Sequence, residues 1–307
     1  MTAASGLVIV DKPGGMTSHD VVARIRRLAG TRRVGHAGTL DPMATGVLVV
    51  CVEKATRLLG HLTLTEKEYD ATIRLGQATD TDDAEGEVVS ETSAAGVRPE
   101  RLAAAVAALR GEISQVPPAV SAIKVAGQRA YKLTREGAPP ELAARTVTVR
   151  EFVLRDVRRG PGLIGPDVIG PDVIGADLLD ADVSVTCSSG TYIRALARDL
   201  GAALGVGGHL TRLRRTRVGP YRAGDAHTLD ALARSFELLP LAEAAAAAFP
   251  RLDLPADQAD RLAHGGRLPA GGADETGPVA AFGPDGALIA LVTAAEGRYR
   301  PLAVFVP

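Results

Sequence analysis

The chain has 307 residues, 46% of them hydrophobic but only 3% aromatic, which predicts a core of aliphatic side chains and alanine in a large domain plus a small one. Its two cysteines, both in apolar runs, exclude a disulfide framework, and no cysteine or histidine spacing is typical of a zinc site. Because no basic segment leads into an apolar one and no run approaches about 20 apolar residues, we expect a soluble, cytoplasmic protein without a membrane anchor.

Charge is unevenly distributed along the chain, although the formal net charge is only -1. Residues 1–60 carry eight Lys and Arg against four Asp and Glu, and residues 188–224 carry seven Arg against one Asp. Residues 61–120 between them carry five against eleven. Local patches set the potential that a polyanion meets, so the two basic regions fit a nucleic-acid partner. Taken singly, such runs are more often solvated faces.

A short predicted strand and a turn-rich loop at residues 11–18 open the chain, and apolar residues at helical spacing then predict a helix at residues 20–29. Gly30 ends this helix. Lys12 lies in the loop before the helix, and Arg33 lies after it, in an arginine cluster. Because such cations suit phosphate geometry, we expect Lys12 and Arg33 to hold phosphates of a nucleic acid.

Residues 34–48, Val-Gly-His-Ala-Gly-Thr-Leu-Asp-Pro-Met-Ala-Thr-Gly-Val-Leu, place one carboxylate, Asp41, in a glycine-rich loop ahead of an apolar strand. The glycines free the backbone to turn, and Pro42 biases Asp41 away from helical dihedrals. A single acid held on a rigid edge beside a histidine, here His36, indicates a reactive site. An isolated Asp-Pro pair would more often be a plain turn.

A predicted helix at residues 53–61 leads to an alternating strand at residues 67–76, which carries Tyr69. Because tyrosine is a good strand residue, Tyr69 is by itself as readily a core aromatic as a site residue. The acidic loop at residues 79–85 lacks the ligand pattern of a calcium loop. We therefore expect a solvated turn there.

Residues 117–137 mix lysine and arginine, including Lys124, with glycine and one aromatic residue. Such a loop suits a clamp over a polyanion. Beyond an alternating strand at residues 146–157, the pentapeptide Ile-Gly-Pro-Asp-Val occurs twice in succession within residues 164–177, which is too short for a solenoid. We expect a surface insertion between strands at about residues 160–177.

A further strand runs into residues 188–200, where a predicted helix carries Tyr192 and Arg194 in its first turn and Ser and Thr residues offer caps. On spacing alone Arg194 is more often a surface cation. The next predicted strand, residues 209–217, is basic and includes the apolar Leu213. Its arginines suit the lining of an RNA groove, although a charged edge strand is an alternative.

The pattern over residues 228–247 predicts helix before Pro250, a natural boundary. Alternating apolar runs after it predict a small, mostly β module at residues 250–307. Strands and helices alternate without a regular βαβ period, so the expected fold class is α+β, a mixed, largely antiparallel sheet with surrounding helices. We expect Asp41 and Tyr69 to line one central cleft.

The block at residues 34–48 resembles the signature of the TruB family of RNA pseudouridine synthases almost word for word. The prolines, the Ser-Ala-x-Lys and the Gly-x-Arg-x-Tyr of residues 117–137 are also similar to that family, and the ordered likeness extends over roughly residues 6–250. It implies the pseudouridine synthase fold, with a central RNA-binding cleft, in residues 1–249 and a PUA-like RNA-binding domain in residues 250–307.

The resemblance also implies a reaction, the isomerisation of uridine 55 in the T loop of tRNA to pseudouridine. Its nucleophile is an aspartate acting on a flipped-out nucleotide, and it needs no cofactor and no metal. The implied partner is the T arm of tRNA, bound by a monomer. By this resemblance Asp41, Tyr69 and Arg194 would be catalytic, with Arg194 keeping Asp41 ionised. The expected substrate-binding residues are His36, Tyr69, Tyr192 and Leu213, together with Lys12, Arg33 and Lys124 at the phosphates.

Two other classes of function stay open at this point. A non-catalytic tRNA-binding or RNA-folding protein would use the same basic surfaces without chemistry, and the formation of pseudouridine in a tRNA transcript in plain buffer separates it from an enzyme. A carboxylate-dependent glycosidase is less well supported, because such enzymes usually need a second acid near the first and none is visibly coupled to Asp41.

Overall fold

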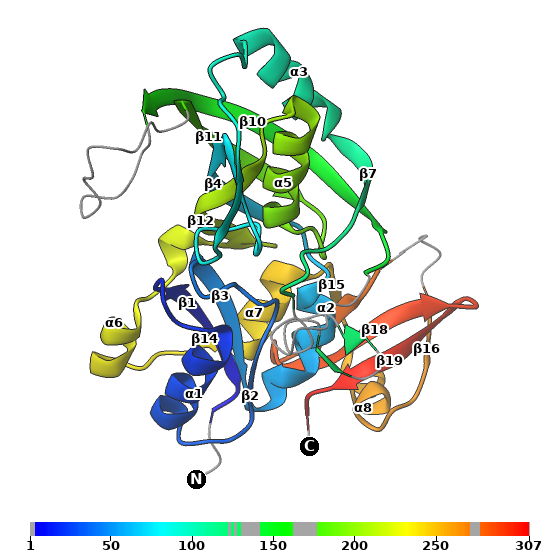
Figure 1. Cartoon of the computed structure of the whole chain (residues 1–307). Helices are drawn as coiled ribbons and strands as arrows, with labels where there is room; N and C mark the ends of the chain where they lie inside the picture. Colours follow the sequence, from blue (N-terminus) through cyan, green and yellow to red (C-terminus); the bar gives the residue numbers. More distant parts are fainter. Residues whose placement is uncertain are drawn as a thin grey trace. The chain divides into compact units, whose positions relative to one another are not determined.

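The structure is a computed structural model and describes residues 4–121, 124–125, 128–129, 142–161, 177–270 and 277–306. The chain forms two compact units, and one of them is built from both ends of the chain (Figure 1). Unit 1 joins Met1–Thr65 to Arg217–Pro307, and unit 2 is the intervening Glu66–Thr216. The repeat expected to form a surface insertion lies outside the described residues, except for its last residue, Asp177, which begins a strand.

Unit 1 is built on a central pair of antiparallel strands. Strand β1 (Gly6–Lys12) pairs with β3 (Thr45–Val52) along its whole length, from Gly6 opposite Val52 to Lys12 opposite Gly46. Strand β2 (Val34–His36) adds to β3, and β14 (Leu239–Pro240) adds to β1. The continuous apolar run of β3 is buried from Gly46 to Val52, as such runs predict.

Unit 1 has further elements among its described residues before residue 250. They are α1 (Ser18–Ala29), the 3-10 helix η1 (Glu53–Leu58), α2 (Leu59–Thr63), β13 (Tyr221–Arg222), η2 (Ala223–Asp225), α6 (Leu229–Arg234) and α7 (Leu241–Ala248). The single helical run expected at residues 228–247 is therefore two helices, because the chain between them extends to pair β14 with β1.

Helix α1 begins and ends at capping residues that are close to it in the sequence. Thr17 accepts a hydrogen bond from the Asp20 amide, the Asp20 carboxylate accepts one from the Thr17 amide, and the two form a capping box. At the other end Gly30 adopts a left-handed φ of 64°, which glycine allows at little cost. The predicted helix and its stop at Gly30 are confirmed, with the start two residues earlier.

The C-terminal part of unit 1 is a five-stranded sheet in the order β15-β17-β18-β19-β16. Its elements are β15 (Arg251–Asp253), α8 (Ala256–Ala263), β16 (Leu268–Pro269), β17 (Val279–Phe282), β18 (Leu288–Ala295) and β19 (Arg298–Val304). Helix α8 packs Ala259 and Leu262 into a core on one side of this sheet. The strands that the sequence predicted in the small β module are confirmed. Helix α8 was not predicted.

A second core joins this sheet to the N-terminal strands. Leu7 of β1 and Val49 of β3 share a buried cluster with Phe282, Leu291 and Phe305 from the C-terminal segment. The segment after residue 249 thus has a sheet of its own, yet it also completes the hydrophobic core of the strands that carry the Asp41 loop. Domains at residues 1–249 and 250–307 stay a prediction.

Unit 2 contains an antiparallel series β4-β11-β10-β7, with β12 next to β4. The strands are β4 (Lys67–Leu75), β5 (Gln77–Thr79), β6 (Val88–Glu91), β7 (Gly111–Gln115), β8 (Lys124–Val125), β9 (Gln128–Arg129), β10 (Arg145–Pro161), β11 (Asp177–Cys187) and β12 (Gly208–Val218, of which the last two residues belong to unit 1). The mixed, largely antiparallel α+β fold class is thereby confirmed.

In the described residues of unit 2, helices α3 (Pro99–Ala108) and α5 (Ile193–Leu204) pack on each other. Helix α3 also packs on β10, and α5 on β4 (Figure 1). Helix α5 comes very close to the chain that follows it. A side-chain carbon at Gly201 would lie 2.2 Å from the carbonyl carbon of Gly207. Glycine at this position therefore sets how near the helix and the start of β12 approach.

Candidate active site

Asp41 lies in the connection of an antiparallel hairpin. Strands β2 and β3 pair from Val34 opposite Val52 to His36 opposite Val50, and the Ala37 amide then bonds to the Val49 carbonyl at 2.9 Å. The Asp41 carbonyl accepts the Ala44 amide at 3.1 Å. Asp41 itself is half-buried. The short strands therefore hold one carboxylate in a defined turn at the end of a buried strand.

Side chains from the end of β1 and the start of α1 hold this turn on both sides of Asp41. The hydroxyl of Ser18 accepts the Leu40 amide at 2.9 Å and lies 3.0 Å from the Leu40 carbonyl, to which it donates. The ammonium of Lys12 donates to the Pro42 carbonyl at 3.1 Å. Bonds placed immediately before and after Asp41 restrict its backbone, which is how a reactive group is positioned in advance.

Lys12, which was expected to hold a nucleic-acid phosphate, points inward in this structure, and a phosphate contact stays a prediction. Its side chain is fully buried, and its ammonium also donates to the carbonyls of Pro13 at 2.8 Å and Met16 at 2.6 Å. A buried ammonium needs such hydrogen-bond partners. The sequence placed Lys12 in a loop but did not show that the loop folds over its own lysine.

His36 and Arg33 also belong to unit 1. The His36 ring is partly buried and meets the His19 ring edge to face at a centroid distance of 5.6 Å. The Arg33 side chain is 69% exposed, and its guanidinium lies 3.7 Å from the Glu53 carboxylate. Arg33 is therefore accessible to a partner in solution, and a contact with phosphate stays a prediction.

Arg194 lies in the first turn of α5 and is 4% exposed, in contrast to the surface cation that its spacing favoured. Its Nη1 donates to the Thr81 carbonyl at 2.9 Å, and its Nη2 donates to the Val120 carbonyl at 2.9 Å. The Asp83 carboxylate lies 3.3 Å from Nη1. The guanidinium is thus fixed in orientation by contacts from distant parts of the sequence.

Asp83 corrects the interpretation of residues 79–85 as a solvated turn. Asp83 is only 3% exposed. One of its carboxylate oxygens accepts the Thr81 hydroxyl at 2.6 Å and the Glu85 amide at 3.0 Å, while the other faces Arg194. The loop turns inward because a buried arginine needs a buried counter-charge. No feature of a run of acidic residues showed which carboxylate would do this.

A second ion pair lies beside the first. Arg198, one turn further along α5, lies 3.2 Å from the Asp82 carboxylate and donates to the Val116 carbonyl at 2.8 Å. Burial raises the pKa of Asp82, and the neighbouring guanidinium groups of Arg198 and Arg194 oppose that rise. The acidic loop of unit 2 is therefore an internal counter-charge for α5.

The start of α5 is held by Gln115 and not by the expected Ser or Thr cap. The Gln115 side-chain oxygen accepts the Tyr192 amide at 2.8 Å, and its amide nitrogen donates to the Tyr192 carbonyl at 3.1 Å. Gln115 is 1% exposed, at the end of β7. A side chain remote in sequence satisfies the helix terminus, and Tyr192 stays half-buried beside it.

The other expected site residues of unit 2 lie on strands. Tyr69 on β4 is 7% exposed and is paired with Val185 of the neighbouring strand β11. Leu213 on β12 is 5% exposed. Lys124 lies in β8, opposite Arg129 of β9. The basic strand β12 does not turn all its arginines outward, since Arg215 is 1% exposed.

One titratable side chain near Tyr69 is strongly perturbed. Burial, and secondly the charge of Arg215, lower the pKa of Lys67 to about 8. Lys67 lies on β4 opposite Cys187 of β11, whose thiol pKa burial raises to about 11. Cys187 and Cys51 are both buried free thiols, as expected.

The expected site residues thus fall into two groups. Unit 1 carries Asp41, His36, Arg33 and Lys12, and unit 2 carries Tyr69, Tyr192, Arg194, Leu213 and Lys124. One cleft shared by Asp41 and Tyr69 stays a prediction. Within the described residues there is no cluster of three metal-ligating side chains, and no helix is long and apolar enough to cross a bilayer.

Comparison with known proteins identifies the family. Residues 26–193 match the N-terminal domain of the TruB family of pseudouridylate synthases. Residues 194–259 match a tRNA pseudouridylate synthase B C-terminal domain, and residues 249–306 match the C-terminal domain of tRNA pseudouridine synthase II.

Full-length relatives agree with these matches. The chain is 61% identical over 302 residues to the tRNA pseudouridine synthase B of Thermobifida fusca, covering 98% of this chain and 99% of the relative. It is 58% identical over 304 residues to that of Streptomyces griseus, covering 99% and 98%. A chain of an H/ACA RNP bound to a substrate RNA containing 2′-deoxyuridine superposes with a TM-score of 0.69 at 26% identity, covering 98% of this chain and 85% of that one. This chain belongs to the TruB family of pseudouridylate synthases.

Proposed function

We propose that this tRNA pseudouridine synthase isomerises uridine 55 in the T loop of tRNA, with Asp41 as the nucleophile on a flipped-out nucleotide. The relatives named tRNA pseudouridine synthase B support the tRNA substrate. The observation that carries the role of Asp41 is its turn, which Ser18 and Lys12 hold by bonds to the residues on either side. We further expect a monomer that binds the T arm and works in the cytoplasm.

The reaction needs one carboxylate and no redox partner. The bond between N1 of uracil and C1′ of ribose breaks, the base turns, and a bond from C5 to C1′ forms. The proton of C5 leaves and N1 gains one, so atoms and electrons balance within the nucleotide. An ionised carboxylate can assist by adding to the base or by attacking C1′, and the role proposed for Asp41 is compatible with both.

The remaining residues would bind the nucleotide and set its electrostatics. Arg194 is proposed to keep Asp41 ionised, since a cation close to a carboxylate favours its charged form, and Asp83 would hold the Arg194 guanidinium in place. Tyr69 would stack on the extruded uracil and assist removal of the C5 proton, while His36 would occupy the space that the base leaves. Tyr192 and Leu213 would complete the pocket, with Arg33 and Lys124 at phosphates.

The test is Asp41→Asn, assayed for pseudouridine in a single turnover with enzyme in excess over tRNA transcript. Asn keeps the shape but loses the charge and nearly all nucleophilicity, so we expect chemistry to collapse while tRNA affinity persists. Asp230→Asn, an exposed residue of α6, is the matched control and should behave as the parent. Activity of Asp41→Asn within about tenfold of the parent, ~1.4 kcal/mol of barrier, would contradict the role of Asp41. A purely RNA-binding protein would bind tRNA in every variant and modify it in none.

A further inference from the structure

The rings of His19 and His36 meet at the start of the loop that carries Asp41. Their centroids lie 5.6 Å apart and their planes cross at 83°, so the edge of one ring faces the other. Aromatic pairs favour this arrangement at such distances. His36 is the last residue of β2, and His19 is the second residue of α1. Two rings from different elements are therefore in contact at this loop.

The backbone of His19 is held in place on both sides. One residue earlier, the Ser18 hydroxyl accepts the Leu40 amide at 2.9 Å and donates to the Leu40 carbonyl at 3.0 Å. The capping box of Thr17 and Asp20 closes around the same helical turn. These bonds fix the first turn of α1 relative to the loop that carries the proposed nucleophile, and they fix the point from which the His19 side chain extends.

Helix α1 is also attached to the strand that carries His36. Arg26 of α1 donates from its Nη2 to the carbonyl of Val34, the first residue of β2, at 3.1 Å. At the other end of β2, His36 pairs with Val50 of β3. The backbones from which the two rings extend are therefore held in position by bonds that do not involve the rings.

The contact restricts the rotation of the His36 side chain. The His36 ring is only partly buried, and His19 is exposed. A side chain at the end of a strand can turn about its torsions unless a neighbour limits it, and a ring packed edge to face removes part of that freedom. Functional side chains work best when packing holds their rotamers in advance. His36 is proposed to enter the space that the extruded base leaves, which requires a defined direction of its ring.

We infer that His19 is a positioning residue, which orients the His36 imidazole for entry into the RNA loop when the target base is extruded. This inference rests on the role proposed for His36. His19 acts only through His36 and does not touch the reacting nucleotide. Because His36 fills its place after the base has left the stack, its orientation should affect the extruded complex more than the first docking of tRNA.

The test is a double-mutant cycle of His19→Ala and His36→Ala. Pseudouridine formation in a tRNA transcript is measured in single turnovers over a series of enzyme concentrations. We expect His19→Ala to lower the rate at saturating enzyme by about fivefold, as the loss of an aromatic pair predicts, and to leave the half-saturating concentration within about twofold of the parent. In the His36→Ala background, His19→Ala should have no further effect, because residues that act as one unit are not additive.

Two single variants separate orientation from other roles of a histidine. His19→Phe keeps a ring at this position but no ring nitrogen, so it should restore the parental rate. Failure of this rescue would show that His19 acts through its nitrogens or its charge and would overturn the inference. His227→Ala removes an exposed histidine of the same unit that bonds to β1 through its backbone, and it should behave as the parent. A thermal melt of each variant shows that the fold is kept.

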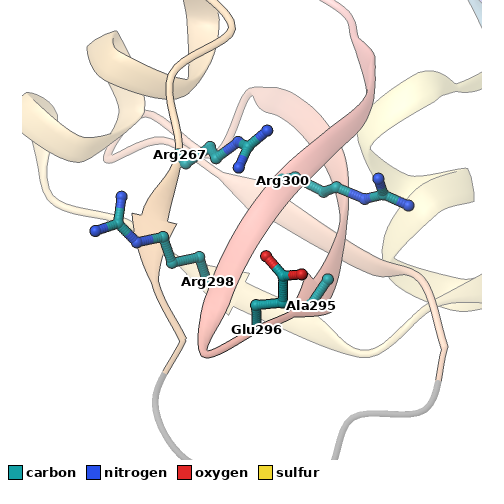
Figure 2. Close-up of a pocket in the computed structure, with 5 residues that line it drawn as sticks. All are labelled: Arg267, Ala295, Glu296, Arg298 and Arg300. Atoms are coloured by element: carbon teal, nitrogen blue, oxygen red, sulfur yellow. The ribbon is translucent and has the colours of Figure 1, made fainter.

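A contact of His19 with an RNA phosphate would give a different result. The half-saturating concentration would rise, and it would rise equally in the His36→Ala background. The comparison variant for this pattern comes from the hollow in the C-terminal sheet that Arg267, Arg298 and Arg300 line (Figure 2). The C-terminal segment is expected to bind RNA, so Arg298→Ala should raise the half-saturating concentration and keep the saturating rate. The same pattern in His19→Ala would contradict the inference.

The cycle also distinguishes this inference from the proposed function. If the parent enzyme forms no pseudouridine in tRNA, the proposed function fails and the role of His19 fails with it. If His36→Ala keeps the parental rate, the role proposed for His36 is wrong, and so is that of His19. If the parent is active and His36→Ala is slow, but His19→Ala is as fast as the parent or slows both backgrounds equally, only the inference about His19 is wrong.

Discussion

Asp83 and Arg194 form a buried ion pair in unit 2. Both side chains are about 4% exposed, and their charged atoms lie 3.3 Å apart. Burying two charges is costly unless each is also hydrogen-bonded, and both conditions are met: Arg194 donates to two carbonyls and Asp83 accepts from Thr81 and Glu85. The pair fixes the direction of a guanidinium that is proposed to act on the nucleophile.

At this scale we predict the effect of Asp83→Asn. Asn still accepts the Thr81 hydroxyl and the Glu85 amide but no longer balances the Arg194 charge, so the guanidinium should lose its orientation. We expect the single-turnover rate to fall by at least about tenfold, equivalent to ~1.4 kcal/mol, with tRNA affinity within about threefold of the parent.

The control is Asp80→Asn in the same loop, where the exposed side chain accepts the Glu87 amide at 2.9 Å. Asn can keep that bond, so the control should modify tRNA at the parental rate. Rapid-quench measurement of pseudouridine formation distinguishes the two. Equal rates for both variants would show that Asp83 does not act through Arg194.

At the scale of elements, the packing of α5 against the chain that follows it decides where Arg194 and Tyr192 lie. A Cβ at Gly201 would meet the Gly207 carbonyl carbon at 2.2 Å and the Gly208 nitrogen at 2.3 Å. Both are backbone atoms, which cannot turn aside as a flexible side chain can. A larger residue must therefore push the helix away from the start of β12.

We predict that Gly201→Ala lowers the free energy of unfolding by about 3 kcal/mol, the upper range for overpacked sites. Chemical denaturation followed by circular dichroism gives the value. Ala203→Gly, on the exposed side of the same helix, should cost only about 1 kcal/mol, through helix propensity alone. If Gly201→Ala proves no worse than this control, the close contact is not a constraint on the fold.

At the scale of the whole molecule, the two compact units are interleaved along the chain. Unit 2 is one continuous segment inserted into unit 1, whereas unit 1 needs both ends of the chain. Its shared core contains Leu7 and Val49 from the first segment and Phe282, Leu291 and Phe305 from the last. Removing the last segment would expose apolar surface of the strands that carry the Asp41 loop.

We predict that a chain ending at residue 249 loses the cooperative unfolding of unit 1, because Leu7 and Val49 lose the side chains that cover them. A fragment of residues 66–216 alone should retain the cooperative unfolding of unit 2. Differential scanning calorimetry of the two fragments and the full chain tests this. A fragment 1–249 with two intact transitions would instead establish an independent domain that ends at residue 249.

Features that depend on neighbouring residues could be predicted from the sequence. The spacing of Val21, Val22 and Ile25 and the stop at Gly30 predicted α1, because capping and amphipathic periodicity act within a few residues. The apolar run of β3 and the alternation of β4 predicted their strands. The glycine and proline signals around Asp41 predicted a turn that presents a carboxylate, and the order of motifs identified the family.

Which polar groups are buried together depends on the folding of distant segments onto one another, and the sequence did not predict it. The fold turns Lys12 inward to the carbonyls of the loop that follows it, pairs Asp83 with Arg194, and places Gln115 at the start of α5. Each of these contacts joins segments that lie apart in the sequence or depends on how a loop closes. A local sequence pattern indicates only the conformational propensity of its own residues. A buried charge must be paired to avoid a large desolvation cost, and its partner is a residue that the fold brings close.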